Sequence, residues 1–105
     1  MVKIPDLVTK KIHLFIDELE RNNIHIQKAI LFGSFALGTA NEWSDIDLAL
    51  VSDRFTGDRF DDREMIREYK AVAGWDISPY PYTPADFDTS FFVRDEILEK
   101  GLVIR

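Results

Sequence analysis

The chain has 105 residues, enough for one domain with a hydrophobic core of useful size, and we expect a single domain over residues 1–105. Apolar residues make up 46% of the sequence and charged residues 30%, as in ordinary globular proteins. The net charge is −6, with thirteen basic residues against nineteen acidic ones. Because tight binding of a nucleic-acid backbone requires clustered lysine and arginine, this balance argues against a templated polymerase or repair enzyme, and we expect no nucleic-acid partner.

The sequence also bears on compartment. No apolar run approaches the roughly 20 residues that a membrane helix needs, and no signal peptide opens the chain. Cysteine is absent, so disulfide bonds and thiol chemistry are excluded. We therefore expect a cytoplasmic protein without a membrane partner.

Hydrophobic periodicity predicts the elements of the first half of the chain. Apolar residues spaced by three or four positions predict a helix from Pro5 to Arg21. Asn22 and Asn23 end it, since asparagine tolerates the left-handed conformation. Four further elements follow: a strand over Ile24–Phe32, a short helix over Ser34–Leu37 closed by Gly38, a loop over Thr39–Ser44 and a strand over Asp45–Val51.

The second half continues the alternation. After a loop over Asp53–Asp58, a helix runs to about Ala73, with Phe60 and Val72 on its apolar stripe, and Gly74 ends it. A third strand is predicted over Trp75–Tyr82, at an edge of the sheet, because Pro79 and Pro81 cannot donate to a ladder. Three features close the chain: an N-cap at Thr83 with Pro84 at the first helical position, a helix over Phe91–Lys100, and a short strand over Leu102–Ile104. This order predicts an α+β (α/β) fold, a small mixed β-sheet covered by helices on one face.

Chemistry concentrates between Ile30 and Val51. Asp45 and Asp47 open a strand, and because side chains alternate along a strand they point the same way, with Cα atoms about 7 Å apart. Two adjacent carboxylates repel each other unless a cation lies between them, and Mg²⁺ takes one or two carboxylates together with substrate phosphates. Upstream, Gly33 and Ser34 lie where a strand gives way to a helix, a place where free N–H groups favour a phosphate. A phosphate-binding turn close in sequence to a metal-binding pair of carboxylates indicates nucleotide chemistry.

Gly33-Ser34, ten residues, and then Asp45-x-Asp47 resembles the signature of the DNA polymerase β-like nucleotidyltransferase superfamily. The short chain is similar to its minimal nucleotidyltransferase branch, which is commonly found as the antitoxin partner of HEPN-domain proteins. The resemblance covers roughly residues 24 to 100. It implies a nucleotidyltransferase core and an Mg²⁺-dependent transfer of a nucleoside monophosphate, AMP from ATP, to a hydroxyl acceptor.

The resemblance also implies residue roles. Asp45, Asp47 and Asp76 become the catalytic and metal-binding carboxylates of a site for two Mg²⁺ ions, with Asp76 approaching from the third strand to activate the acceptor. Gly33 and Ser34 become the nucleotide-binding residues. The expected partner is a HEPN-family toxin that is modified on a hydroxyl side chain, most naturally tyrosine. One departure is Leu37, because many relatives have a basic residue there; Arg54, Arg59 or Arg63 could supply the missing charge.

Three alternatives stay open. The chain could be a non-catalytic antitoxin module that only binds a protein, or it could transfer the nucleotide to a small molecule. Locally, Ser44 and Asp45 could simply cap a loop, and Trp43 is expected to anchor that loop. An EF-hand is excluded because Ala49 and Leu50 stand where a ligand and the turn glycine would be required, and a P-loop is excluded by the lack of a Gly-Lys-Ser/Thr run.

Overall fold

A computed structural model describes residues 3–105. Its centre is a four-stranded sheet with the order β3-β2-β1-β4. Strand β1 pairs antiparallel with both β2 and β4, whereas β2 and β3 are parallel, so the sheet is mixed. The strands are β1 (Lys28–Phe32), β2 (Ile46–Val51), β3 (Ile77–Tyr82) and β4 (Leu102–Val103). This confirms the predicted fold class.

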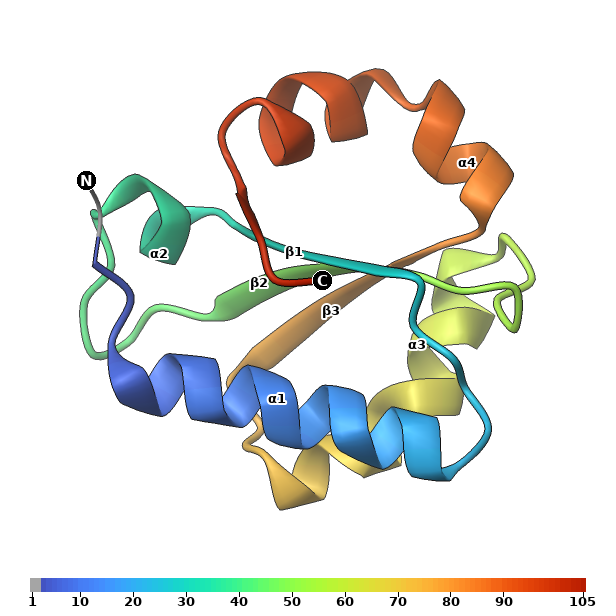
Figure 1. Cartoon of the computed structure of the whole chain (residues 1–105), viewed down its shortest axis with the longest axis horizontal. Coiled ribbons are helices and arrows are strands. Elements are labelled where there is room, and N and C mark those ends of the chain that lie inside the picture. The colour runs from blue at the N-terminus through green and yellow to red at the C-terminus, as the bar shows by residue number, and fades with distance from the viewer. Residues whose placement is uncertain (1–2) are drawn as a thin grey trace.

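Helices cover both faces of the sheet, and in Figure 1 α1 lies below it while α4 lies above it. The helical elements are α1 (Asp6–Arg21), α2 (Ser34–Leu37), α3 (Arg59–Arg67), the 3₁₀ segment η1 (Glu68–Val72), α4 (Pro84–Thr89) and the π-type segment η2 (Val93–Leu98). No helix within residues 3–105 combines the length and apolar character needed to cross a bilayer.

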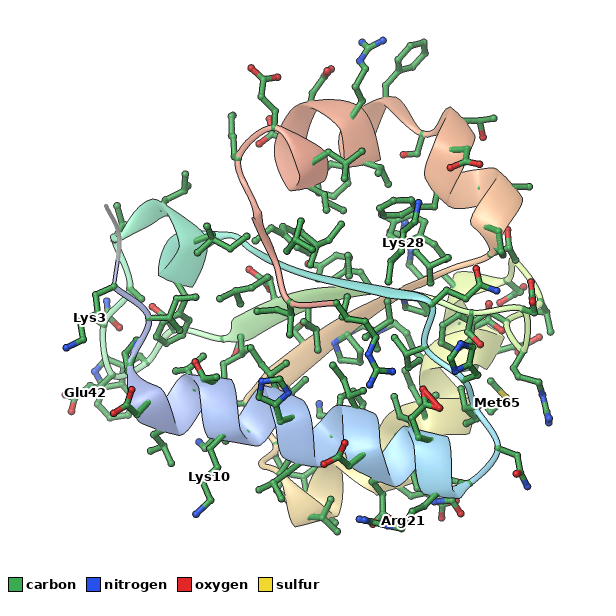
Figure 2. All side chains as sticks on the ribbon, in the orientation of Figure 1. Lys3, Lys10, Arg21, Lys28, Glu42 and Met65 are labelled. Atoms are coloured by element: carbon green, nitrogen blue, oxygen red, sulfur yellow. The ribbon has the colours of Figure 1, made fainter. Side chains whose placement is uncertain are left out.

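The prediction that helices cover one face is wrong, because the alternating side chains of β1 and β2 are apolar on both faces. On one face, Leu31 and Leu48 pack in a core formed with α1 and α3. On the other, Phe32 and Ala49 belong to a second core to which α4 contributes Phe87 and η2 contributes Val93 and Ile97. Lys28 lies beneath α4 on this second side (Figure 2), with its Nζ atom 5.4 Å from the centroid of the Phe87 ring.

Strand β3 lies at an edge of the sheet, as its prolines predicted. Its register explains why both prolines are tolerated. The carbonyls of Asp76 and Tyr82 accept hydrogen bonds from Ile46 and Ser52, so even-numbered residues turn their backbone groups toward β2. Pro79 and Pro81 are odd-numbered and turn theirs outward, where no ladder donor is lost.

Several boundaries differ from the predicted ones. Strand β1 begins at Lys28 rather than Ile24, because the Ile24 N–H still bonds to the Leu19 carbonyl and closes the helix end. Strand β3 begins at Ile77, so Asp76 lies one residue before it. The predicted apolar stripe of the α3 region fails at two of its members, Phe60 and Val72, which are exposed. The N-cap at Thr83 is confirmed by a bond from the Asp86 N–H to its hydroxyl.

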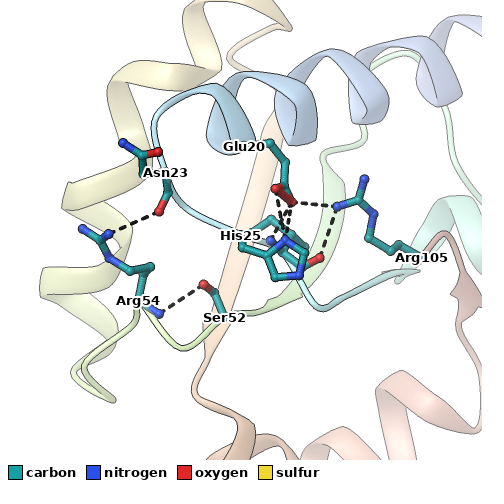
Figure 3. A network of polar contacts seen from close by, with 7 residues as sticks. Glu20, Asn23, His25, Ser52, Arg54 and Arg105 are labelled. Atoms are coloured by element: carbon teal, nitrogen blue, oxygen red, sulfur yellow. Dashed lines mark hydrogen bonds and ion pairs between the residues drawn. The ribbon is translucent and has the colours of Figure 1, made fainter.

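The C-terminal turn of α1 is tied through Glu20 to the segment before β1 and to the residue that ends the chain after β4 (Figure 3). Its carboxylate accepts hydrogen bonds from the Ile26 N–H at 2.9 Å and from Arg105 at 2.8 Å, and His25 lies 3.1 Å away. The Ile26 N–H bond, followed by the His25 and Arg105 bonds, lowers the pKa of Glu20 despite the opposing effect of burial. Arg105 also donates to the Ile26 carbonyl, so the chain end is fixed beside β1.

Replacing Glu20 with glutamine should lower the free energy of unfolding at pH 7 by about 1 kcal/mol, since charge-assisted bonds are weakened. A carboxyl whose pKa is lowered on folding stabilises the protein above its unfolded pKa, and that contribution is lost as pH falls through the folded pKa. The difference between wild type and Glu20→Gln should therefore be present at pH 7 and vanish in acid, as measured by urea unfolding. The exposed Glu42→Gln variant is the control. A difference independent of pH would contradict the assignment.

Candidate functional site

Antiparallel pairing of β1 and β2 brings the two halves of the sequence motif to one end of the sheet. Phe32, the last residue of β1, lies opposite Asp47, the second residue of β2, so Gly33 follows directly beside that carboxylate. By strand alternation, Asp47 points to the same face as Phe32 and Ala49. Asp45 precedes the strand and is exposed. Gly33, Asp45 and Asp47 are thus brought together.

Gly33 is required at this point by both conformation and space. Its φ is +75°, in the region that favours glycine. A Cβ atom at this position would overlap the Oδ2 atom of Asp47. The next residue, Ser34, begins α2, and its carbonyl accepts from Gly38 and Thr39, while the described residues provide no hydrogen-bond partner for its hydroxyl. The backbone turn therefore lies directly against the carboxylate.

The two aspartates form a like-charge pair that the described residues do not neutralise. No hydrogen bond or ion pair from residues 3–105 reaches either carboxylate. Burial, followed by the charge of Asp45, raises the pKa of Asp47. Such a pair at the rim of a sheet has the hard oxygen donors and unbalanced negative charge that suit Mg²⁺.

Asp76 is held differently. Its Oδ2 atom accepts a hydrogen bond from Lys11 Nζ at 3.0 Å, and Lys11 belongs to α1, which covers the opposite face from Asp47. Gly74 makes this arrangement possible, because a Cβ there would lie 2.7 Å from Asp76 Oδ1. Backbone pairing still places Asp76 beside the start of β2, since its carbonyl accepts from the Ile46 N–H. Among residues 3–105, no three acidic, histidine or cysteine side chains converge as a metal site, and the role predicted for Asp76 stays a prediction.

Several other residues considered in the sequence analysis have structural roles in loops and helix caps. Trp43 does not anchor its loop, because its side chain is 83% exposed; the loop is instead held by Asn41 Oδ1, which accepts from the Trp43 N–H, and by Ser44 Oγ, which accepts from the Asn41 N–H. Asp58 caps α3. Asp62 is buried and accepts from Thr56 and Gly57.

A basic groove beside this site is a feature that motif reasoning missed. It lies between α3 and the β3 edge, holds about 550 Å³, and is lined on the helical side by four cations and on the strand side by Pro79. The cations are Arg59, Arg63, Arg67 and Lys70. Their spacing of four, four and three residues is the sequence signal, since it places them on one helical face.

Lys70 links the groove to the acidic residues. Burial, followed by the charges of Arg63 and Arg67, lowers the pKa of Lys70, while Asp45 and Asp76 oppose the shift. The charge of Lys70 therefore interacts with those of both carboxylates. Arg54, in contrast, donates to the Asn23 carbonyl beyond the other end of β2 (Figure 3), so it does not lie at the site.

A glycine-serine turn set against paired aspartates on a mixed sheet with helices on both faces defines a nucleotidyltransferase domain. The comparisons agree: residues 12–104 match the family model described as a nucleotidyltransferase domain, so the chain belongs to that family. A solved structure of a "putative nucleotidyltransferase" from Sulfolobus solfataricus shares the fold, with a TM-score of 0.61 and 17% identity over 98% of this chain and 89% of that one.

A curated relative gives a further comparison. The chain is 39% identical over 61 residues to the "Putative protein adenylyltransferase MJ1305" of Methanocaldococcus jannaschii. The match spans 54% of this chain and 42% of the relative, so the chain matches less than half of that protein's length.

Replacing Asp47 with asparagine should raise the melting temperature at pH 7 in the presence of EDTA by a few degrees. The amide keeps the shape and removes a charge that the fold disfavours. Because folding raises the pKa of Asp47, the Asp47 carboxylate of the wild type binds a proton more readily in the folded state than in the unfolded state. The wild type therefore gains stability as pH falls. The gap should therefore close in acid. The exposed Asp53→Asn variant should show no such gain, and an Asp47→Asn protein less stable than wild type at pH 7 would contradict the account.

Proposed function

We propose that this protein is an Mg²⁺-dependent nucleotidyltransferase that transfers AMP from ATP to a hydroxyl group of a protein. The proposal rests on one observation: Asp45 and Asp47 form an unneutralised pair whose second member lies directly against Gly33. Family membership and the name of the archaeal relative support the reaction class and the protein acceptor, respectively.

The residues present fit a divalent ion and a nucleotide. Asp45 and Asp47 would hold Mg²⁺, whose charge relieves their repulsion and, when bound, neutralises phosphate oxygens and lowers the pKa of an attacking hydroxyl. Gly33 permits close approach of a phosphate to the backbone, and the Ser34 hydroxyl is available as a donor. A second ion would draw on Asp76, which then has to leave Lys11.

The reaction is an in-line displacement. The acceptor oxygen forms a bond to the α-phosphorus of ATP, the bond from that phosphorus to the bridging oxygen breaks, and pyrophosphate leaves. The hydroxyl proton passes to the Asp76 carboxylate. The task of Gly33, Ser34 and the two aspartates is to hold the reacting groups in line, which supplies much of the rate in such transfers.

We assign the acceptor to a HEPN-family toxin modified on tyrosine, which makes this protein its cytoplasmic antitoxin. The resemblance of the Gly33-Ser34 and Asp45-x-Asp47 motif to the minimal nucleotidyltransferase branch supports this assignment. The exposed Leu37, in place of a basic residue, removes one cation from the turn. Lys70 is a cation whose charge interacts with those of Asp45 and Asp76, but it approaches them from the β3 side of β2.

The alternative is a non-catalytic antitoxin module that only binds its toxin. One observation favours it: the third carboxylate is already neutralised by Lys11 at 3.0 Å. Nucleotide transfer to a small molecule has no such support from the described residues.

The test is co-expression with the product of the neighbouring gene, followed by intact-mass analysis of both chains. We expect the partner to gain the mass of one AMP with wild type and none with Asp45→Asn/Asp47→Asn. Incubating the purified proteins with each NTP and Mg²⁺ then establishes the base preference. A stable complex that neither variant modifies would overturn the enzymatic proposal in favour of the binding module.

A further inference from the structure

We propose that the basic groove between α3 and the β3 edge binds an acidic, extended peptide segment of the acceptor protein and leads it to the site at Asp76. This inference deepens the proposed function and rests on it for the role of the bound segment. The binding itself requires no nucleotide chemistry and can be tested alone.

The groove concentrates uncompensated positive charge on an acidic protein. The net charge of the chain is −6, yet among residues 3–105 four cations and a single carboxylate, that of Glu64, line this one surface. Arg67 forms an ion pair with Glu64 at 3.6 Å, whereas within residues 3–105 no carboxylate lies within ion-pair distance of Arg59, Arg63 or Lys70. A row of unpaired cations is complementary to a row of carboxylates on a partner.

The cationic groups are also held in place. Arg59 lies 5.8 Å from the Tyr82 ring centroid and Arg63 lies 5.9 Å from that of Tyr80. Lys70 lies 6.0 Å from the Trp75 ring. Cations placed over aromatic rings lose some of their freedom before any ligand arrives, which lowers the entropic cost of binding.

The row has a direction that ends at the acidic site. Arg59 lies by Tyr82 at the end of β3, Arg63 by Tyr80 in its middle, and Lys70 by Trp75, the neighbour of Asp76, just before its start. From Arg59 to Lys70 the helical segments rise about 17 Å, the length of about five extended residues. The strand order β3-β2-β1 puts this groove and the Gly33 turn on opposite sides of β2. A nucleotide at Gly33 and an acceptor in the groove would therefore meet at the aspartates.

A peptide matches this groove better than a nucleic acid does. The register of β3 turns the carbonyls of Ile77, Pro79 and Pro81 to the outer edge, and the two prolines offer no N–H there. Such an edge accepts hydrogen bonds from peptide N–H groups but presents only negative dipole ends to a phosphate. The overall negative charge adds repulsion for any polyanion that extends beyond the groove.

Binding is measured by fluorescence anisotropy with three labelled probes. The first is a peptide with a central tyrosine flanked on each side by four glutamates, and the second has glutamine in place of every glutamate. The third is an eight-nucleotide oligothymidylate. We expect the acidic peptide to bind at least roughly tenfold more tightly than either of the others at low salt, with affinity falling as salt rises. Arg59→Glu/Arg63→Glu should abolish this preference, and Arg59→Gln/Arg63→Gln should reduce it. Arg94→Glu/Lys100→Glu, an equal charge change at exposed positions on the other face of the sheet, should retain it.

Two outcomes would overturn the inference: equal binding of the glutamate and glutamine peptides, or oligothymidylate binding as tightly as the acidic peptide. Full competition by ATP would also do so, because the groove would then be a phosphate site. Asp45→Asn/Asp47→Asn should keep the preference for the acidic peptide over the other two probes. Peptide binding without any nucleotide transfer to the co-expressed neighbouring gene product would refute the proposed function while leaving the groove assignment intact.

Discussion

The candidate site depends on the register in which β1 and β2 pair. That register sets Phe32 opposite Asp47 and so places the Gly33 turn against a carboxylate that the fold partly buries. A slip of one residue would turn Asp47 into the apolar core formed with α1, where an uncompensated charge is strongly disfavoured. Asp47 is the polar residue of β2, so this register is favoured because it keeps the carboxylate out of that core. The packing of the sheet therefore determines where the like charges lie.

Three aspartates at one end of the sheet meet three different environments. Asp45 is exposed, Asp47 is partly buried against a glycine, and Asp76 is paired with Lys11. The first two keep an electrostatic cost that a divalent cation can relieve, whereas the third is already neutral as a pair. Binding of an ion that recruits Asp76 has to compete with Lys11, and this competition links α1 to the chemistry. Lys70, which lines the groove, also interacts with the charges of Asp45 and Asp76.

Local chemistry made much of the fold predictable. The end of α1 before Asn22 and Asn23, the short helix closed by Gly38, the Thr83 cap and the edge position of β3 each follow from residues that permit few conformations. The glycine-serine turn and the aspartate pair were likewise found from spacing. Two features could not be predicted from the sequence because they depend on tertiary contacts. They are the second helical layer and the Lys11–Asp76 pair, which joins residues 65 positions apart. The groove could not be predicted from the sequence either, because the spacing of its cations is that of any solvated helix face. Only the position of β3 beside that face makes it a groove.

The central claim, that Asp45 and Asp47 together hold a divalent ion with a nucleotide, is most directly tested by Mn²⁺ binding. Mn²⁺ prefers the same oxygen ligands as Mg²⁺, and its binding in the presence of ATP can be followed by water-proton relaxation. The account predicts a ternary complex with wild type and with the control Asp53→Asn/Asp61→Asn, and an affinity weakened at least roughly tenfold in Asp45→Asn/Asp47→Asn. Equal affinity in the two double variants would contradict it.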